Sequence, residues 1–453
     1  MPGPVDGRRA GPRPPPARGP APVGAVSARR FPGLPARSPH RPGPRLAHVH
    51  EVSRFPGVGA PMARFGGLLA TDLLDVTDDP AALDAGGWWA VAVDYEGRVT
   101  CARFGRVRPD PRPPRAAGRR HAPDPGRWTS SLDREAYVAG VRRIREHIAA
   151  GEVYQANLCR VLSAPVGPDT DPDALAADLA AGNPAPHAGV IRVPSRGVEI
   201  ACASPELFLR REGAVIESGP IKGTGRTEAD LLEKDRAENV MIVDLVRNDL
   251  GRVCVPGTVT VPRLCAVEAH PGLVHLVSTV RGELRGGTGW PELLLAAFPP
   301  GSVTGAPKSS ALRILRGLET VPRGPYCGAV GWVDADRRRG ELAVGIRTFW
   351  IDRARSGAGE LRFGTGAGIT WGSDPEREWR ETELKAARLL AIAAGRPTGP
   401  PTGAPGRAGT AGRGAAIGEV GGTVARTTGS GGPGERERRG ADPRPRRENE
   451  AMR

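Results

Sequence analysis

The stretch GAVGWVDADRRRGELAVGIRTFWID, residues 328–352, decides the fold class of this chain. Extended apolar runs lie on both sides of a polar tip that carries three consecutive arginines, Arg337 to Arg339. Two such runs joined by a short polar turn predict an antiparallel hairpin, since parallel neighbours need a long crossover between them. The stretch therefore indicates an antiparallel sheet and argues against a regular alternation of strand and helix.

The same arrangement recurs earlier in the chain. WWAVAVDYEGRVTCARFG, residues 88–105, contains two extended runs around a turn at Glu96, and residues 153–164 form one extended run. Residues 197–224 predict two or three further strands with turns between them. Because the long strands occur as hairpins and the helices cluster between them, we expect an α+β fold with large antiparallel sheets packed against helices.

Helices are predicted from apolar periodicity, capping patterns and Gly/Pro turns. The longest of them should begin at a capping pattern formed by Thr227 and Asp230. The expected helical segments are 131–153, 227–253, 290–319 (two helices around a turn) and the residues that follow Asp374.

The net charge of +14 is concentrated at the two ends of the chain. Residues 1–50 carry a net +8 and residues 396–453 a net +5, in segments rich in Pro, Gly and Arg. Such segments hold too few apolar residues to offset the entropy of ordering, so we expect 1–55 and 396–453 to be disordered tails. Between them we expect a variable N-terminal part that ends in a Pro/Arg-rich linker, 56–128, and one large domain, 129–395.

The composition argues against several classes of function. The arginines of the tails are not interleaved with aromatic residues, so the basic charge does not predict a nucleic-acid surface. The six cysteines include no CxxC pair, which argues against a zinc site or a disulfide framework and favours the reducing cytoplasm. No apolar run reaches the length of a membrane-spanning helix, so no membrane partner is expected.

Lys222 stands in a constrained Pro/Gly turn within IESGPIKGTGRT, residues 216–227. A lysine that is kept neutral can act as a nucleophile, whereas most single lysines in turns are simply solvated. Glu206 lies sixteen residues upstream, at the end of an apolar strand. If the two strands pair, Glu206 and Lys222 could face one cavity and the carboxyl group could act as a general acid. An exposed Glu at a strand end is the alternative.

Charged residues on two predicted helices are candidates for a metal site. Glu238 points along an apolar stripe, so we expect it to be paired or to bind a cation, unless it only favours the helix dipole. Glu381 and Lys385 have the spacing of an ion pair on a solvated helix face. Two carboxylates from different helices, together with water and a substrate carboxylate, would suit Mg²⁺.

Anion-binding candidates lie in the last third of the large domain. Arg347 shares an expected strand face with small residues, which leave room for a carboxylate ligand, although a structural ion pair is the alternative. Residues 364–370, GTGAGIT, form a Gly-rich strand end whose N–H groups could meet an anion. GSVTGAPKSS, residues 301–310, has the wrong spacing for a phosphate loop, so we expect no nucleotide there. His275 alternates with apolar residues, as a core histidine does.

Nine short motifs follow one another between residues 130 and 392. They are GEVYQANL, SPELFL, SGPIKGT, DRAENVMIVDLVRNDLGRV, HLVSTVRGEL, FPPGSVTGAPK, GIRTFW, GTGAGIT and EWRETELKA. Their order resembles the family of chorismate-utilising enzymes. The resemblance implies the α+β fold of that family, a chorismate-binding catalytic domain at 129–395, and an Mg²⁺-dependent enzyme.

The resemblance also implies roles for individual residues. Lys222 matches the covalent nucleophile, and Glu206 the general acid, of the aminodeoxychorismate synthase branch of the family. Glu238 and Glu381 match the Mg²⁺ ligands. The implied substrate-binding residues are Gly223, Thr224, His275, Thr304, Arg347, Gly366, Ala367, Gly368 and Lys385.

Two positions select the branch. Members that aminate C2 of chorismate, anthranilate synthase component I and 2-amino-2-deoxyisochorismate synthase, usually have Ala at the position of Lys222. Members that add water have a lysine at the position of Gln155. The resemblance therefore implies amination at C4, giving 4-amino-4-deoxychorismate for p-aminobenzoate and folate synthesis, with C2 amination as the alternative. It also implies that ammonia comes from a separate glutamine amidotransferase subunit.

Overall fold

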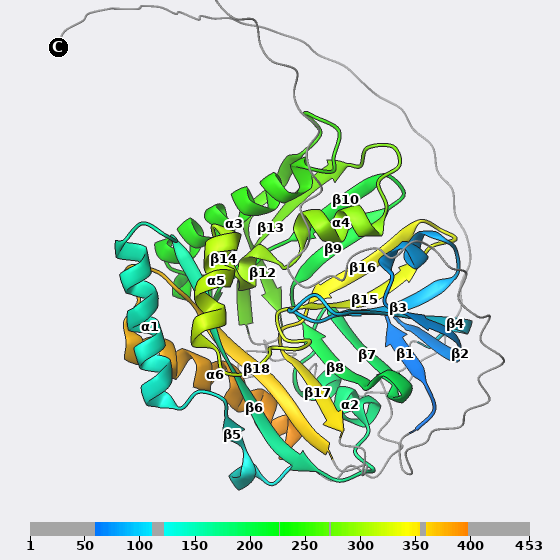
Figure 1. The fold of residues 1–453 in the computed structure, drawn as a ribbon, viewed down its shortest axis with the longest axis horizontal. Coiled ribbons are helices and arrows are strands. Elements are labelled where there is room, and N and C mark those ends of the chain that lie inside the picture. The colour runs from blue at the N-terminus through cyan, green and yellow to red at the C-terminus, as the bar shows by residue number, and fades with distance from the viewer. Residues whose placement is uncertain (1–58, 111–121, 226, 271–272, 354–358, 397–453) are drawn as a thin grey trace, which may run out of the picture. The chain divides into compact units, whose positions relative to one another are not determined.

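The computed structural model describes residues 59–110, 122–225, 227–270, 273–353 and 359–396 (Figure 1). The two predicted tails, apart from Arg396, and most of the predicted linker lie outside the described residues. Within the described ranges, no helix combines the length and the apolar composition that crossing a membrane requires.

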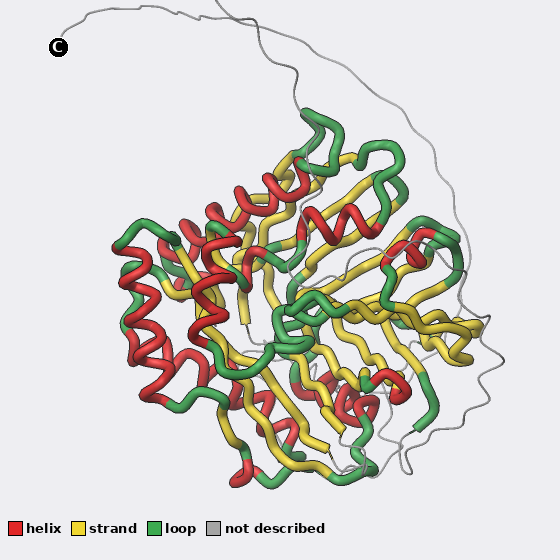
Figure 2. Tube along the Cα trace, in the orientation of Figure 1, coloured by secondary structure: helices red, strands yellow, loops and turns green. Residues whose placement is uncertain are grey.

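Six α-helices and eighteen strands occur in the described part of the chain, and the strand pairs are antiparallel (Figure 2). This confirms the predicted α+β class with a large antiparallel sheet. The helices are α1 (Arg134–Ala149), α2 (Pro172–Gly182), α3 (Glu233–Gly251), α4 (Trp290–Ala297), α5 (Lys308–Leu318) and α6 (Pro375–Ala393). The strands are β1 (Met62–Phe65), β2 (Leu68–Thr77), β3 (Trp88–Val93), β4 (Val99–Pro109), β5 (Thr129–Ser130), β6 (Gln155–Val166), β7 (His187–Val193), β8 (Val198–Ser204), β9 (Leu207–Glu212), β10 (Val215–Gly219), β11 (Ile221–Gly225), β12 (Thr260–His270), β13 (Leu273–Glu283), β14 (Gly305–Ala306), β15 (Ala329–Asp334), β16 (Arg339–Val344), β17 (Thr348–Arg353) and β18 (Gly359–Ile369).

The predicted hairpin at 328–352 forms a junction in the sheet. β15 and β16 pair with each other from Ala329 opposite Val344 to Asp334 opposite Arg339. β15 also pairs with β3 of the N-terminal hairpin β3–β4, while β16 pairs with β9. The hairpin therefore joins the N-terminal strands to the strand that follows Glu206.

Three apolar clusters hold the helices against the sheet (Figure 1). α1 and α5 pack on β6 and β18, and Tyr137, Val141 and Ile144 of α1 are fully buried there, as their helical spacing predicts. α2 and α6 belong to a second cluster with β17 and β18. α3 and α4 belong to the third and largest cluster, which also contains β15 and β16.

The helix predicted over 227–253 begins later than expected. Thr227 and Asp230 cap a separate 3-10 turn, in which the Thr227 N–H donates to the Asp230 carboxylate. α3 then begins at Glu233, and Asp235 accepts a hydrogen bond from the Leu232 N–H at 2.9 Å. Two competing acidic caps therefore divide the segment, and the second one starts the long helix. α4, α5 and α6 occur where they were predicted.

Residues 197–224 form four strands, β8 to β11, so the prediction of two or three strands is wrong. The additional strand arises at Pro220, which separates β10 from β11. A proline has no N–H to give to a strand ladder, so the pairing must be interrupted there. As a result β10 pairs with β9 and β13, while the only partner of β11 among the described strands is β13.

Candidate active site

Lys222 lies beside a β-bulge in β11. The pairing of β11 with β13 shifts its register between Lys222 and Thr224, and the intervening Gly223 has a φ of +70°. A Cβ atom at Gly223 would also come within 2.9 Å of the Asp235 side chain. Glycine is therefore required at this position, and the bulge fixes the direction of the neighbouring side chain.

The half-buried Lys222 side chain reaches two other segments of the site. Its Nζ donates to the main-chain carbonyl of Ser302 at 3.2 Å and lies 3.6 Å from the place that a Cβ atom of Gly368 would take. Burial lowers the pKa of Lys222, although the Glu238 and Glu206 carboxylates counteract this effect. A larger fraction of this amine is therefore neutral than in a solvated lysine, and only the neutral amine is nucleophilic.

Glu206 lies between β8 and β9 and is only 4% exposed, so it is not an exposed strand-end residue. The strand that follows it, β9, pairs with β10 rather than with β11, and Leu207 is opposite Gly219. The Ile221 N–H of β11 lies near the Glu206 carboxyl group and lowers its pKa. Burial raises the pKa of Glu206 to about 7, while hydrogen bonds from the Ser302 hydroxyl and the Ile221 N–H and the charge of Lys222 limit the rise. A carboxyl group that is half protonated near neutral pH can donate a proton to a leaving group.

Glu238 of α3 and Glu381 of α6 each lie beside a lysine of their own helix, and both act on the amine of Lys222. The charges of both carboxylates raise the pKa of Lys222, which places both near its amine. Lys234 lies 3.6 Å from Glu238, and Lys385 lies 2.6 Å from Glu381. Burial raises the pKa of Glu381, but the lysine charges outweigh it and the net pKa is lowered, so this group is a carboxylate at neutral pH.

Two carboxylates on separate helices fit Mg²⁺, because this ion keeps several waters and takes few protein ligands. In the ranges that the structure describes, no group of three or more His, Cys, Asp or Glu side chains gathers closely enough to hold a metal. A binding site for Mg²⁺ built on Glu238 and Glu381 would therefore depend on water or on the substrate for its remaining ligands.

The Gly-rich end of β18 lies next to Lys222. β17 pairs with β18 only from Gly359 to Phe363, so the second half of β18 is paired with β6. A Cβ atom at Gly368 would come within 2.1 Å of the Gln155 amide nitrogen, and the Gly366 carbonyl accepts a hydrogen bond from Lys385 at 3.1 Å. Ala367 instead packs into the apolar cluster under α1. The two glycines, and not Ala367, thus present bare main chain to the site.

Arg347 does not lie on a strand face, so that prediction is wrong. It lies in the bend between β16 and β17 with a φ of +50°, because β16 pairs with β9 whereas β17 crosses to β8. Burial lowers the pKa of the Arg347 guanidinium. Among the described residues no carboxylate forms an ion pair with it, which argues against the structural alternative and leaves its donors for an anionic ligand.

Two further predicted residues are buried at the edges of this arrangement. His275 of β13 is opposite Thr224 and is 1% exposed, and its Nδ1 lies 3.4 Å from the Gly223 carbonyl. Thr304 is fully buried, and its hydroxyl donates to the Pro300 carbonyl at 2.8 Å. His275 therefore contacts the bulge beside Lys222, while the Thr304 hydroxyl is engaged within its own turn.

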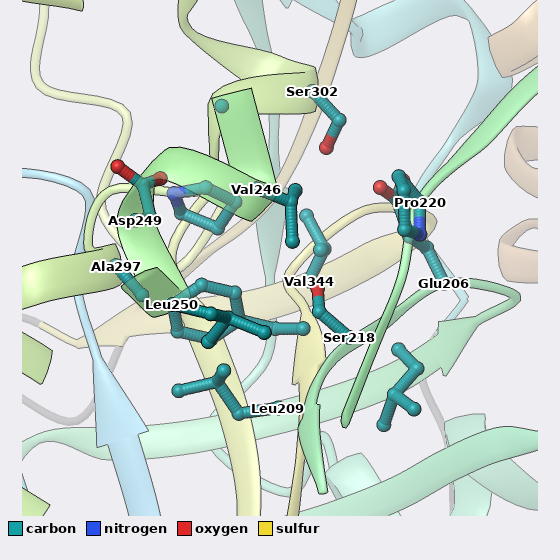
Figure 3. A pocket seen from close by; sticks show the side chains of 14 residues that line it. Glu206, Leu209, Ser218, Pro220, Val246, Asp249, Leu250, Ala297, Ser302 and Val344 are labelled. Carbon is teal, nitrogen blue, oxygen red and sulfur yellow. The ribbon is translucent and has the colours of Figure 1, made fainter. Parts of the chain in front are cut away.

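The sequence interpretation missed Ser302, which contacts both Lys222 and Glu206. Ser302 and Glu206 lie at one end of a cavity of about 20 Å³, and Asp249 lies at the other end (Figure 3). GSVTGAPKSS has the wrong spacing for a phosphate loop and overlaps one of the family motifs, but a serine in a turn has neither charge nor periodicity to mark it. The contacts of Ser302 form only in the folded chain, where its turn lies against Lys222 of β11.

Comparison with known proteins identifies the family of this chain. Residues 89–391 match the family of chorismate binding enzymes, and the chain belongs to this family. Anthranilate synthase component 1 of Streptomyces coelicolor is 41% identical over 275 residues, which are 58% of this chain and 52% of that protein. A rice protein (Oryza sativa subsp. japonica) named "Probable aminodeoxychorismate synthase, chloroplastic" is 41% identical over 274 residues, 57% of this chain and 30% of that protein.

A solved structure has the same fold. Anthranilate synthase component I from Streptococcus pneumoniae superimposes with a TM-score of 0.58 at 23% sequence identity, over 81% of this chain and 100% of that one. The chain spans about half of the length of the Streptomyces protein and less than a third of the rice protein. Relatives of both names are equally similar, so family membership leaves the individual reaction open.

Proposed function

We propose that this chain catalyses the Mg²⁺-dependent amination of chorismate at C4, as an aminodeoxychorismate synthase component 1. The observation that carries this proposal is that Lys222 and Glu206 lie close enough to shift each other's pKa. A half-buried amine with a lowered pKa and a carboxyl group with a pKa of about 7 lie within reach of one residue, Ser302. Such a pair can form a covalent adduct and protonate a leaving group at the same time.

In the first step the neutral Lys222 amine attacks C2 of chorismate. The C2–N bond forms, both ring double bonds shift by one position (C1=C2 to C1=C6 and C5=C6 to C4=C5), and the C4–O bond breaks. Glu206 in its protonated form gives its proton to the departing hydroxyl, which leaves as water. The raised pKa of Glu206 supplies this proton near neutral pH, and the lowered pKa of Lys222 supplies the lone pair.

In the second step ammonia attacks C4 of the adduct. The C4–N bond forms, both ring double bonds shift back to C1=C2 and C5=C6, and the bond between C2 and Lys222 breaks. Lys222 is released as an amine, and the product is 4-amino-4-deoxychorismate. We propose that the ammonia comes from a glutamine amidotransferase subunit, because the residues of this site offer no chemistry for glutamine hydrolysis.

Other residues orient the substrate in this proposal. Glu238 and Glu381 would hold Mg²⁺, which when bound would neutralise the ring carboxylate of chorismate. Arg347, whose guanidinium has no carboxylate partner among the described residues, would bind the second carboxylate together with the bare main chain of Gly366 and Gly368. His275, whose Nδ1 lies 3.4 Å from the Gly223 carbonyl, would contact the ring beside the bulge, while the side chain of Thr224 lies outside what the structure describes.

Amination at C2 is the second candidate, and it is favoured by the Streptomyces relative named anthranilate synthase. Incubation of the chain with chorismate, Mg²⁺ and ammonium, followed by chromatography and mass spectrometry of the product, separates the two. We expect 4-amino-4-deoxychorismate. Formation of anthranilate or 2-amino-2-deoxyisochorismate would replace the proposal with the C2 reaction.

A further inference from the structure

Ser302 touches the proposed acid and the proposed nucleophile with different parts of one residue. Its hydroxyl lies close enough to the Glu206 carboxyl group to lower the pKa of that group, and both residues line one cavity. Its main-chain carbonyl accepts a hydrogen bond from Lys222 Nζ at 3.2 Å. The side chain is 7% exposed and lies at the Glu206 end of the cavity in Figure 3. The distance between the two reacting groups is thus set through a single residue of a third segment.

Two cations, the half-buried Lys308 and the buried Arg323, fix the segment that carries Ser302. Lys308 donates to the carbonyls of Ala297 (2.9 Å) and Pro299 (3.2 Å) and to the Asp249 carboxylate (2.7 Å). At the other end the guanidinium of Arg323 donates to the Val303 carbonyl at 3.0 Å. Charged donors make strong hydrogen bonds inside a protein, so both ends of this turn are held in place.

Arg323 is itself immobilised from several directions. It is 1% exposed, forms an ion pair with Glu319 and donates to the Asn157 carbonyl at 2.7 Å. Its own N–H donates to Glu96 in the turn between β3 and β4. The Ser302 segment is therefore anchored to the sheet and to the N-terminal hairpin.

We propose that Ser302 is a positioning residue that holds the acid through its hydroxyl and aims the nucleophile through its carbonyl. This proposal rests on the proposed C4 amination. A neutral amine has one lone pair, and when one N–H is bound to a carbonyl the lone pair points away from it. The hydroxyl donor in turn holds the Glu206 carboxylate and favours its ionised form.

Three variants test the two halves of this proposal. Ser302→Ala removes the hydroxyl, Ser302→Thr keeps it, and Ser302→Gly removes it and also loosens the main chain that bears the carbonyl. Ser309→Ala makes the same change on the exposed face of α5 and is the control. Each is assayed for kcat, for KM with chorismate and for the pH dependence of kcat/KM.

Ser302→Ala should lower kcat roughly tenfold to a hundredfold, because a hydrogen bond to a charged group is lost, with little change in KM. The alkaline limb of its kcat/KM profile should move to higher pH, because loss of the Ser302 hydroxyl raises the pKa of Glu206. Ser302→Thr should have nearly the wild-type kcat and the wild-type alkaline limb. The kcat of Ser302→Gly should be several-fold lower than that of Ser302→Ala, and Ser309→Ala should match the wild type.

If the alkaline limb of the kcat/KM profile of Ser302→Ala stayed at the wild-type pH, the hydroxyl would not act on Glu206, even if activity fell. Equal kcat values for Ser302→Gly and Ser302→Ala would remove the role of the carbonyl. The wild-type product decides the proposed function separately: a wild type that makes no C4-aminated product refutes that function. A wild type that makes it, beside unaffected Ser302 variants, refutes only the inference about Ser302.

Discussion

The sheet side and the helix side of the candidate site are built differently. Lys222 and Glu206 are held by groups of the main chain and by Ser302, and Glu206 is almost fully buried. Glu381 and Lys385 on α6 are each half exposed and pair with one another. On the sheet side Glu206 is shielded from water and Lys222 is held by a hydrogen bond to the main chain. On the helix side the charged side chains are long and lie near water. We infer that the sheet sets the position of reaction and the helices supply adjustable charge.

The largest effect should come from Lys222, the proposed nucleophile on the sheet side. Lys222→Ala should lower kcat for C4 amination by roughly a thousandfold or more, since no other amine occupies this place. Lys222→Arg keeps the charge but offers no neutral amine, so it should be equally inactive. Product formation with chorismate, Mg²⁺ and ammonium is the measurement. A Lys222→Ala protein with wild-type kcat would show that the sheet side does not carry the covalent chemistry.

On the helix side, Glu238→Gln should weaken Mg²⁺ binding by about a hundredfold, because an anionic oxygen ligand becomes neutral. Titration calorimetry with Mg²⁺ measures this without reliance on turnover. Glu233→Gln, on the exposed first turn of α3, is the matched control and should bind Mg²⁺ like the wild type. Equal affinities for Glu238→Gln and Glu233→Gln would contradict the assignment of the ligand.

Burial of Glu206 should appear in the dependence of stability on pH. The pKa of about 7 in the folded state lies above the ordinary value of 4.5. The folded protein therefore binds this proton more tightly, and the free energy of unfolding falls as pH rises from about 4.5 to 7. Glu206→Gln lacks this titration, so its stability relative to the wild type should improve over that range by on the order of 3 kcal/mol.

Urea denaturation at pH 5 and pH 8 measures the difference. Glu212→Gln, at the exposed end of β9, should show no such trend. A stability difference between Glu206→Gln and the wild type that stays constant with pH would mean that Glu206 is not buried as a neutral acid.

The smallest effect concerns Lys234, a half-exposed cation opposite Glu238. Mg²⁺ must compete with this ammonium for the carboxylate, so Lys234→Ala should tighten Mg²⁺ binding a few-fold. Calorimetry at two salt concentrations is the measurement, and the gain should shrink at the higher one. Weaker Mg²⁺ binding by Lys234→Ala would show that the lysine supports the site instead of competing for it.

The sequence predicted the helices and strands better than it predicted where they begin, end and bend. The hairpin at 328–352 was readable because both of its strands alternate and its tip is polar. The position of Arg347 was not readable, because a strand that changes partners from β9 to β8 must bend, and that bend depends on distant strands. The predicted start of α3 was wrong for a related reason: Thr227 with Asp230, and Asp235, offer equally good local caps.

The candidate site shows the same limit. Lys222 and Glu206 could be singled out from a constrained turn and a charged strand end. Ser302 could not, because its two contacts come from its main chain and from a hydroxyl, neither of which leaves a pattern in the sequence. Burial, which gives Glu206 its raised pKa, also depends on segments far away along the chain.

The pairing of β3 with β15 has a practical consequence. The six residues from Ala329 to Asp334 are hydrogen-bonded along their whole length to Val93 through Trp88. A shortened protein that started at residue 129 would leave this edge of the central hairpin bare. An uncovered apolar edge recruits strands from other molecules, so such a protein should precipitate or form amyloid-like aggregates even though the proposed catalytic residues would all be retained.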